Sequence, residues 1–304
     1  MTPGGPSASG TRRRAWIALA VVCVVWGTTY LAIKVALETI PPFLMGGVRY
    51  VAAGLMLAGI LAARGRPLPP VAAWPRLGVL GFCMMALGNG GVVWGEQFVP
   101  SGLTAVMVGT SAFWLVGINA FFARHERLHA RDWLGLTIGF GGIVLLVWPD
   151  ISLGGLSGRQ FAYGVIALQI ACAGWAVGSV YARRHVVPGG VLGSAAFQMI
   201  FGGLMMVVMG TATGEWGHAA LNARTTAAVL YLMIAGAVIG FAAYSYALQH
   251  LPVTAVSLYT YVNPLIAVAL GTWLLGEPFH LRMLFAAAII IIGIVIVTPA
   301  RAAS

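Results

Sequence analysis

The sequence predicts an all-α integral membrane protein in which ten transmembrane helices form two inverted five-helix repeats. Its apolar composition, its long apolar runs and an internal repeat support this prediction. Hydrophobic residues make up 60% of the 304-residue chain, and charged residues make up only 8%. A soluble domain carries about 25% charged residues. Because so few charges would not cover a water-exposed surface, we expect the chain to lie in a lipid bilayer.

Long apolar runs without charges are typical of membrane-spanning helices, which need about 20 residues to cross a hydrocarbon core of about 30 Å. Ten such spans are predicted, at residues 15–36, 43–63, 73–94, 101–122, 132–148, 161–182, 190–210, 226–248, 252–275 and 281–298. Proline and glycine interrupt the chain between many of them, as at Pro41-Pro42 and Pro188-Gly189-Gly190.

Arginine is distributed unevenly between the two sets of span ends. One set holds Arg12, Arg13, Arg14, Arg64, Arg66, Arg76, Arg124, Arg127, Arg131, Arg183, Arg184 and Arg301. The other set holds only Arg159, Arg224 and Arg282. The positive-inside rule then places both termini in the cytoplasm, in a bacterial-type inner (plasma) membrane. The net charge of +10 is therefore a signal of topology, and we expect no nucleic-acid partner.

The two halves of the chain are related in sequence. Residues 98–114 align with 250–266, and Trp26 aligns with Trp175, at offsets of 149 to 152 residues. Each unit holds five spans, and an odd number requires the units to lie upside down relative to each other. Inverted repeats of this kind characterise secondary transporters, with the substrate site between the repeats. We expect a cytoplasmic tail at 1–14, repeats at 15–149 and 160–298, and a second tail at 299–304.

Several motifs together support a family resemblance. They are WGTTYLAIK at 26–34, followed by PP and GGVRY, then GNGGVVWGEQFVPSGLTAVMV at 88–108, and Gly276-Glu277 before the last span. In this order, and with their duplication, they resemble the EamA family of the drug/metabolite transporter superfamily, nearest to its YedA-like branch. The resemblance covers about residues 16–298 and implies a ten-helix carrier that exports or exchanges small metabolites. Such carriers usually have proline where this chain has Ala112, so we expect a kink at Pro264 without an equivalent in the first repeat.

Polar and aromatic side chains at membrane depth are expected to face protein or a water-filled cavity. Trp26 and Trp175 are repeat-related and fall near mid-span, where an interfacial aromatic belt does not explain them. The candidate substrate-binding residues are Trp26, Tyr30, Asn89, Trp94, Trp114, Asn119, Trp175, Tyr244, Tyr259 and Asn263. Pro264 is the candidate hinge. Ordinary helix packing is the alternative interpretation of these aromatic residues.

Lys34, Arg49 and Glu96 are candidates for gating or for an ion pair. Lys34 lies near the outer end of the first span, where it either extends to the interface or attracts an anionic substrate group. Arg49 lies about 10 Å into the second span at the helical rise. We expect a carboxylate partner from Glu96 or Glu38 if its role is structural, and a substrate or gating contact otherwise.

The sequence does not favour an enzyme. All six histidines lie at or near predicted span ends, no HExxH motif occurs, and the three cysteines fall within apolar runs. We expect no metal and no cofactor. A transporter of a small-molecule substrate is the first interpretation, with a channel-like facilitator or a non-transporting receptor or scaffold as alternatives. The substrate, direction and coupling ion are not specified, and a homodimer is left open.

Overall fold

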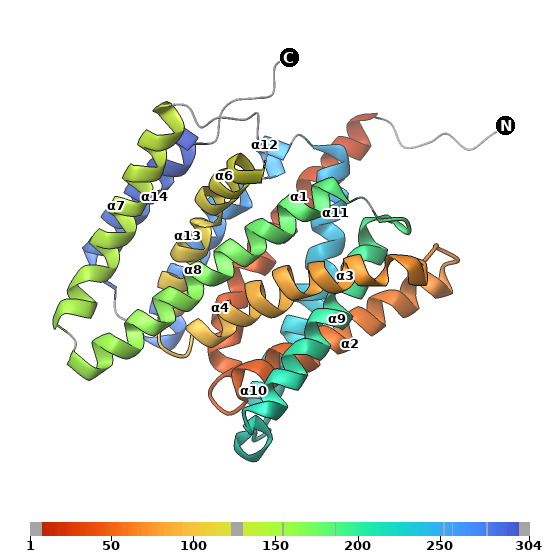
Figure 1. Cartoon of the computed structure of the whole chain (residues 1–304), viewed down its shortest axis with the longest axis horizontal. Coiled ribbons are helices and arrows are strands. Elements are labelled where there is room, and N and C mark those ends of the chain that lie inside the picture. Colours follow the sequence, from red (N-terminus) through yellow and green to blue (C-terminus); the bar gives the residue numbers. More distant parts are fainter. Residues whose placement is uncertain are drawn as a thin grey trace.

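The computed structural model describes residues 8–122, 130–153, 155–185, 187–251, 253–256, 258–277 and 279–297. Regular structure in these ranges is helical throughout (Figure 1). The first half contains α1 (Ala8–Ala36), α2 (Pro42–Ala63), a rod over 71–95, α5 (Ser101–Gly109), α6 (Ser111–Phe122) and α7 (Ala130–Leu153). The rod consists of η1 (Val71–Ala73), α3 (Trp74–Leu80), the π-helical segment η2 (Gly81–Asn89) and α4 (Gly90–Gly95).

The second half follows the same order. It contains α8 (Gly155–Arg184), α9 (Gly190–Ala212), the short η3 (Glu215–His218), a rod over 223–250, α12 (Val253–Val256), α13 (Tyr259–Leu275) and α14 (Leu281–Val297). This rod consists of α10 (Ala223–Tyr231), the π-helical segment η4 (Leu232–Ile239) and α11 (Gly240–His250). The described helices lie at all ten predicted span positions, and several extend beyond the predicted limits because a helix continues past the apolar core.

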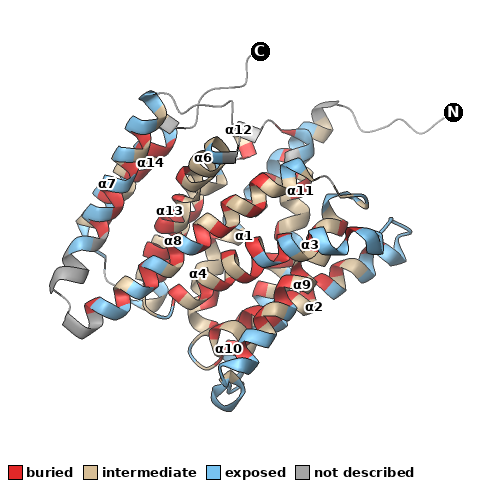
Figure 2. Cartoon of the chain, in the orientation of Figure 1, coloured by how far each residue is buried: buried red, intermediate tan, exposed pale blue. Residues whose placement is uncertain are grey.

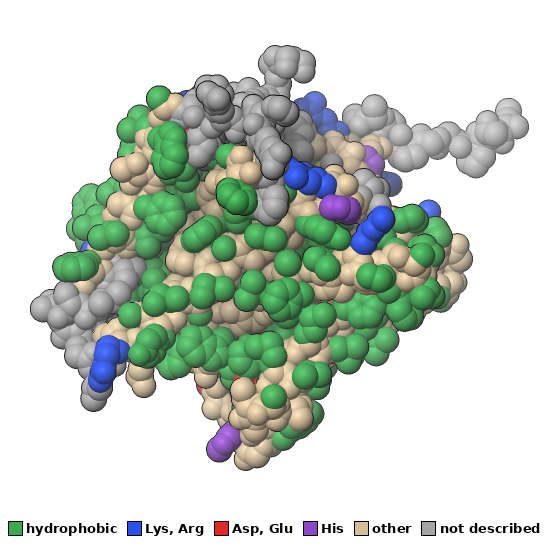
Figure 3. Space-filling model, in the orientation of Figure 1, with side chains coloured by type: hydrophobic (Ala, Val, Ile, Leu, Met, Phe, Trp, Pro, Cys, Tyr) green, Lys and Arg blue, Asp and Glu red, His purple; other side chains and the backbone are tan. Residues whose placement is uncertain are grey.

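The helices are those of an integral membrane protein. Seven described helical segments are long and apolar enough to cross a membrane, and Tyr259–Leu275 and Leu281–Ile296 are apolar but shorter. Large apolar side chains are exposed on the outside of the bundle, as at Phe121 and Trp273. Figure 2 shows exposed residues on the outer helix faces, and Figure 3 shows that many side chains on the visible face are hydrophobic. In water such a surface would aggregate, whereas lipid accommodates it.

Helices from the two halves of the chain pack against each other. The most extensive contacts join α2 to α9 and α7 to α14, which occupy corresponding places in the two halves. Likewise, α1 packs on α11 and α13, whereas α8 packs on η2, α4 and α6. In Figure 1, α7 and α14 run side by side, as do α2 and α9. The main contacts thus join elements that occupy corresponding places in the chain order of the two halves.

Two glutamates that are distant in sequence cap the starts of α2 and α5. Pro41 and Pro100 precede α2 and α5 and supply no side-chain cap. The carboxylate of Glu215 instead accepts hydrogen bonds from the N–H groups of Phe43 and Leu44. Glu277 accepts from the N–H and hydroxyl of Ser101 and from the N–H of Gly102. The first N–H groups of a helix lack partners within the helix, so these carboxylates satisfy them.

These contacts gather several carboxyl groups at one end of the bundle. We call it the glutamate end, defined by Glu38, Glu96, Glu215 and Glu277. There, Lys34 donates to the backbone carbonyls of Glu96 and Val99, and Thr39 donates to Thr225. Side chains thus connect α1 to α10 and to the link between α4 and α5.

The first repeat has a break without a proline. Residues 101–122 form α5 and α6, which are separated at Thr110 rather than joined in one straight helix. The hydroxyl of Thr110 donates to the carbonyl of Met107 at 2.6 Å, and its N–H donates to the same carbonyl at 3.0 Å. This tight turn interrupts the helix near Ala112. The first repeat therefore has a break near Ala112 without a proline. The kink expected at Pro264 stays a prediction, and α13 continues as one helix through Pro264.

Candidate functional site

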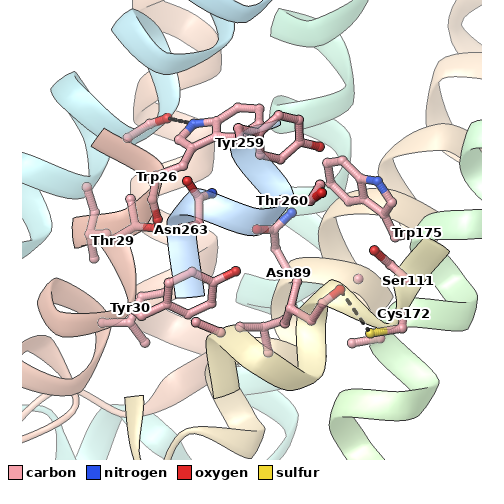
Figure 4. A pocket seen from close by; sticks show the side chains of 18 of the residues that line it. Trp26, Thr29, Tyr30, Asn89, Ser111, Cys172, Trp175, Tyr259, Thr260 and Asn263 are labelled. Atoms are coloured by element: carbon pink, nitrogen blue, oxygen red, sulfur yellow. Dashed lines mark hydrogen bonds between the residues drawn. The ribbon is translucent and has the colours of Figure 1, made fainter. Parts of the chain in front are cut away.

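A cavity lies at the centre of the bundle between the two halves of the chain. Its volume is about 150 Å³, well above the roughly 10–15 Å³ that one water needs by the same measure. Its walls come from α1, α2, η2, α4, α5, α6, α8, η4, α11 and α13. Figure 4 shows Trp26 and Trp175 at opposite sides of the cavity, with Asn89 and Thr260 between them.

One face of α1 supplies part of the wall. Trp26, Thr29, Tyr30 and Ile33 all line the cavity. Their spacing of i, i+3, i+4 and i+7 places them on one side of a helix. The hydroxyl of Thr29 donates to the carbonyl of Trp26 at 2.7 Å. Its donor is therefore satisfied, and placing the hydroxyl within the membrane leaves no polar group unpaired there. This stripe explains why a membrane span carries the sequence WGTTY.

Trp26 is fixed by contacts from the second half of the chain. Its indole N–H donates to the carbonyl of Gly236 in η4 at 3.0 Å. Its ring centroid lies 5.5 Å from that of Phe241, 5.3 Å from that of Tyr244 and 5.2 Å from that of Tyr259. The ring therefore has a bonded edge and packed neighbours, and it presents a defined surface to the cavity.

Trp175 stands against the corresponding part of the first half. A methyl group at Gly88 in η2 would lie 3.5 Å from the Trp175 ring, and one at Gly240 would lie 2.3 Å from Nε1 of Trp26. Gly88 and Gly240 are 152 residues apart, within the range of offsets that relates the two halves. Each cavity tryptophan thus packs near a glycine at the end of a π-helical segment or just beyond it, and at Gly240 the absence of a side chain is what leaves room for Trp26.

The π-helical segments place backbone groups within reach of polar side chains. The wider π-turn is found mainly as short segments inside α-helices, often at functional sites. Gly236 in η4 accepts from Trp26, and Met84 in η2 accepts from the amide of Asn89 at 3.0 Å. Both segments contribute residues to the cavity wall, including Gly88, Asn89, Leu232 and Gly236.

The α13 wall carries the Asn263-Pro264 pair. With its amide nitrogen turned toward the carbonyls, Asn263 donates to Tyr259 and to Cys23 of α1, both at 3.0 Å. Pro264 lies inside α13, which runs from Tyr259 to Leu275 without interruption. Asn263 therefore ties α13 to α1 beside the proline. Whether Pro264 acts as a hinge stays a prediction.

Six of the ten predicted binding residues line the cavity. They are Trp26, Tyr30, Asn89, Trp175, Tyr259 and Asn263, and the hinge candidate Pro264 and the charged Arg49 join them. Their placement beside one another leaves their binding role as a prediction. Sequence reasoning missed Thr29, Tyr50, Ser111, Cys172, Phe241 and Thr260, which also line the cavity. For Thr29, the helical spacing from Trp26 was the available signal.

The other four predicted residues do not line this cavity. The indole of Trp114 donates to the side chain of Gln169 at 3.0 Å. Trp94 contacts Phe98 edge-on at the glutamate end, and Tyr244 packs against Trp26. Asn119 lies in the last turns of α6 and is absent from the cavity wall.

The expected carboxylate partners of Arg49 are not bonded to it. Glu38 forms an ion pair with Arg224, with Nη2 and Oε1 3.0 Å apart. Glu96 is fully buried, and neither of its carboxyl oxygens has a hydrogen-bond partner. The guanidinium of Arg49 instead donates to the hydroxyl of Tyr50 at 3.0 Å. Neither predicted carboxylate is therefore paired with Arg49 here, because Glu38 binds Arg224 and the Glu96 carboxyl oxygens have no hydrogen-bond partner. The alternative, a substrate or gating role of Arg49, stays a prediction.

Lys34 binds backbone carbonyls at the glutamate end. Its ammonium donates to the backbone carbonyls of Glu96 and, at 3.2 Å, of Val99. These carbonyls lie at the end of α4 and in the link to α5. A cation stabilises this end of a helix through the helix dipole and through direct hydrogen bonds. Whether Lys34 lies at the membrane interface or attracts a substrate group stays a prediction.

Comparison with known proteins identifies the fold family. The model of the EamA-like transporter family matches residues 13–148 and again residues 162–298. The chain belongs to the EamA-like transporter family. The two matches of this EamA-like chain together cover most of its length, and family membership identifies it as a membrane transporter rather than an enzyme.

Several relatives of this EamA-like transporter share nearly its whole length. It is 35% identical over 282 residues to the inner membrane transporter YedA of Escherichia coli K12, covering 92% of this chain and 89% of YedA. It is 25% identical over 296 residues to a probable amino-acid metabolite efflux pump of the same strain, covering 94% and 95% of the two chains. One crystal structure, 20% identical, superposes with a TM-score of 0.62 over 94% of this chain and 98% of the other. That likeness supports the fold alone.

Proposed function

We propose that this chain is a secondary transporter that exports or exchanges small metabolites or amphipathic compounds by alternating access across an inner (plasma) membrane. One observation carries the proposal: the central cavity is enclosed by both halves of the chain, with the repeat-related Trp26 and Trp175 in its wall. Carriers built from two repeats hold their substrate between those repeats. The similarity to an efflux pump supports export as the direction.

Reciprocal contacts between α2 and α9 support two inverted repeats, at residues 15–149 and 160–298. A methyl group at Gly54 would lie 2.6 Å from the carbonyl oxygen of Ala196. A methyl group at Gly203 would lie 2.9 Å from the carbonyl oxygen of Gly47. Gly54 and Gly203 are 149 residues apart, as are Gly47 and Ala196. A two-fold axis between the repeats produces pairs of contacts of this kind.

The contacts between α7 and α14 are reciprocal in the same way. A methyl group at Gly142 would lie 3.1 Å from the backbone nitrogen of Ile290, and one at Gly293 would lie 2.7 Å from that of Gly139. The offset is 151 residues for both members of the exchange. Together with the arginine distribution, this pattern supports ten spans with both termini in the cytoplasm.

Reconstitution tests the proposed transport. The purified protein would be placed in liposomes, and uptake by counterflow would be measured for a panel of amino acids, organic acids, amines and nucleosides. We expect saturable counterflow of at least one class. Flux that does not saturate and shows no counterflow would identify a channel-like facilitator. The absence of any flux would favour a receptor or scaffold.

Matched tryptophan variants would locate the transport path. Trp26→Ala and Trp175→Ala should each lower transport by about tenfold or more, equal to about 1.4 kcal/mol of lost binding. Trp133→Ala is the control, because the Trp133 side chain is exposed on α7. Equal effects of all three substitutions would contradict the assignment of the cavity as the substrate site.

A further inference from the structure

Arg49 is the one charged side chain among the described residues that line the cavity. It is 4% exposed, and it belongs to a wall whose other side chains are aromatic, amide, hydroxyl, thiol or aliphatic. A buried guanidinium is costly unless its charge and donors are matched. The protein therefore maintains a single fixed positive charge beside a central cavity.

The guanidinium is held from one side only. One amino group donates to the hydroxyl of Tyr50 at 3.0 Å, and the guanidinium carbon lies 4.4 Å from the centroid of the same ring. The Nε–H of Arg49 is buried and has no partner in the protein. Tyr50 thus orients the fork by a hydrogen bond and a cation–π contact, while the buried Nε–H has no partner within the protein.

The acidic residues Glu96 and Glu38 do not accept a hydrogen bond from Arg49. Glu96 is close enough to interact electrostatically with both Arg49 and Lys34, but its carboxyl oxygens bond to neither. Glu38 is bonded to Arg224. Lys34 uses its ammonium on backbone carbonyls. Of these groups, the Arg49 fork is the one that combines contact with the cavity and an unsatisfied donor.

We infer that the transported molecule is a small organic anion, with a carboxylate bound by Arg49 and an apolar or aromatic body between Trp26 and Trp175. This inference rests on the proposed function, since it names the ligand class of the same cavity. A planar fork binds two carboxylate oxygens side by side. A single guanidinium balances one negative charge, which favours a monocarboxylate over a more highly charged phosphate.

The cavity wall argues against a cationic ligand. Aromatic side chains such as Trp26 and Trp175 bind quaternary ammonium groups in other settings. Here the positive charge of Arg49 would repel such a group at close range, in surroundings where electrostatic energies are large. No described residue of the wall is a carboxylate that would offset this repulsion.

Three probe series, matched in length but different in charge, test the inference. Binding to the purified protein would be measured for phenylacetate, 3-phenylpropionate and 4-phenylbutyrate, for their amides, and for the amines of matching length. We expect the wild type to bind at least one carboxylate about tenfold or more tightly than its amide, which is about 1.4 kcal/mol. A protein that binds none of the carboxylates, or binds amides or amines as tightly, overturns the inference.

Variants assign the preference to Arg49. Arg49→Gln should bring the carboxylate and its amide to within about twofold of each other, and Arg49→Lys should keep only part of the preference. Arg66→Gln removes an exposed arginine outside the cavity wall, just beyond the end of α2, and it should leave the preference intact. A preference that persists in Arg49→Gln overturns the assignment. The wild-type series decides the charge question even if Arg49→Gln does not fold.

The binding series and the liposome assay together distinguish a wrong anion assignment from a wrong transport proposal. Counterflow of amides or amines without carboxylates would keep the transporter function and remove the anion assignment. Arg49-dependent binding of carboxylates by a protein that shows no counterflow of any compound would keep the anion site and remove the transport proposal.

Discussion

At the scale of single residues, three charged side chains of the described residues satisfy backbone groups at helix ends. Glu215 and Glu277 accept hydrogen bonds from the first N–H groups of α2 and α5, and Lys34 donates to carbonyls at the end of α4 and just beyond it. Such groups have no partners within their own helices. Side chains from elsewhere in the bundle therefore bind the unpaired backbone groups at these helix ends. Pro41 and Pro100, which precede α2 and α5, supply no such cap.

The cap supplied by Glu277 gives a first prediction. Glu277→Ala removes the acceptor for two N–H groups and one hydroxyl, and we expect it to lower the free energy of unfolding by about 1–3 kcal/mol. Glu277→Gln keeps one acceptor and should lie between the wild type and the alanine variant. Thermal unfolding in detergent measures both changes.

The control is Glu38→Gln. Its partner Arg224 is 60% exposed and Glu38 is 42% exposed, so this ion pair is expected to contribute at most about 1 kcal/mol. If Glu38→Gln destabilises the protein as much as Glu277→Ala does, distant capping is not what stabilises the start of α5.

At the scale of helices, the sequence predicts where the rods lie but not how they are turned. Hydropathy locates the spans because backbone groups in lipid must be satisfied within a helix. The facing residues depend on the rotation of each rod, and the π-turns of η2 and η4 shift this rotation partway along it. Trp94 follows η2 and points toward Phe98 rather than into the cavity. Trp26 lies in the regular helix α1, where simple spacing identifies its neighbours.

Glycine spacing carries information on which helices touch. Gly91 and Gly95 face α8, Gly174 and Gly178 face η2, and Gly236 faces α1. These glycines belong to GxxxG pairs that can be read directly from the sequence. Such pairs allow helix backbones to approach closely. The sequence does not specify the partner helix, because small residues permit a contact without selecting it.

A second prediction follows at the contact between α7 and α14. A methyl group at Gly293 would lie 2.7 Å from the carbonyl oxygen of Gly135 and from the backbone nitrogen of Gly139. Gly293→Ala must therefore separate the two helices, and we expect a loss of about 1–3 kcal/mol in stability. Gly141→Ala on α7 meets no atom within 4 Å and should be tolerated. Equal melting temperatures for the two variants in detergent would contradict this packing.

At the scale of the whole molecule, the orientation in the membrane gives a third prediction. The basic residues lie mainly at one set of span ends, and most Lys and Arg side chains visible in Figure 3 lie toward the end where α1 begins. We expect both termini to be cytoplasmic. A C-terminal alkaline phosphatase fusion should therefore be inactive, and a C-terminal green fluorescent protein fusion should fluoresce. The reverse result would show that the arginine distribution has been misinterpreted.

Alternating access requires the glutamate end to open, and this requirement gives the last prediction. At this end α1 is tied to α10 by the Thr39–Thr225 hydrogen bond of 2.9 Å and by the ion pair between Glu38 and Arg224. Since α1 also carries Trp26 and Tyr30, its movement relative to α10 would change access to the cavity. Contacts that hold two helices together in one state must break in the other.

A disulfide between these helices should therefore stop transport. In the double variant Thr39→Cys/Thr225→Cys, the two side chains point at each other, which is the arrangement a disulfide needs. We expect oxidation to lower counterflow to background and reduction to restore it. Each single variant under the same oxidant controls for the native cysteines, which lie within α1, η2 and α8. A fully cross-linked double variant that transports at the wild-type rate would show that α1 and α10 stay together through the cycle, and the opening would then have to occur elsewhere in the bundle.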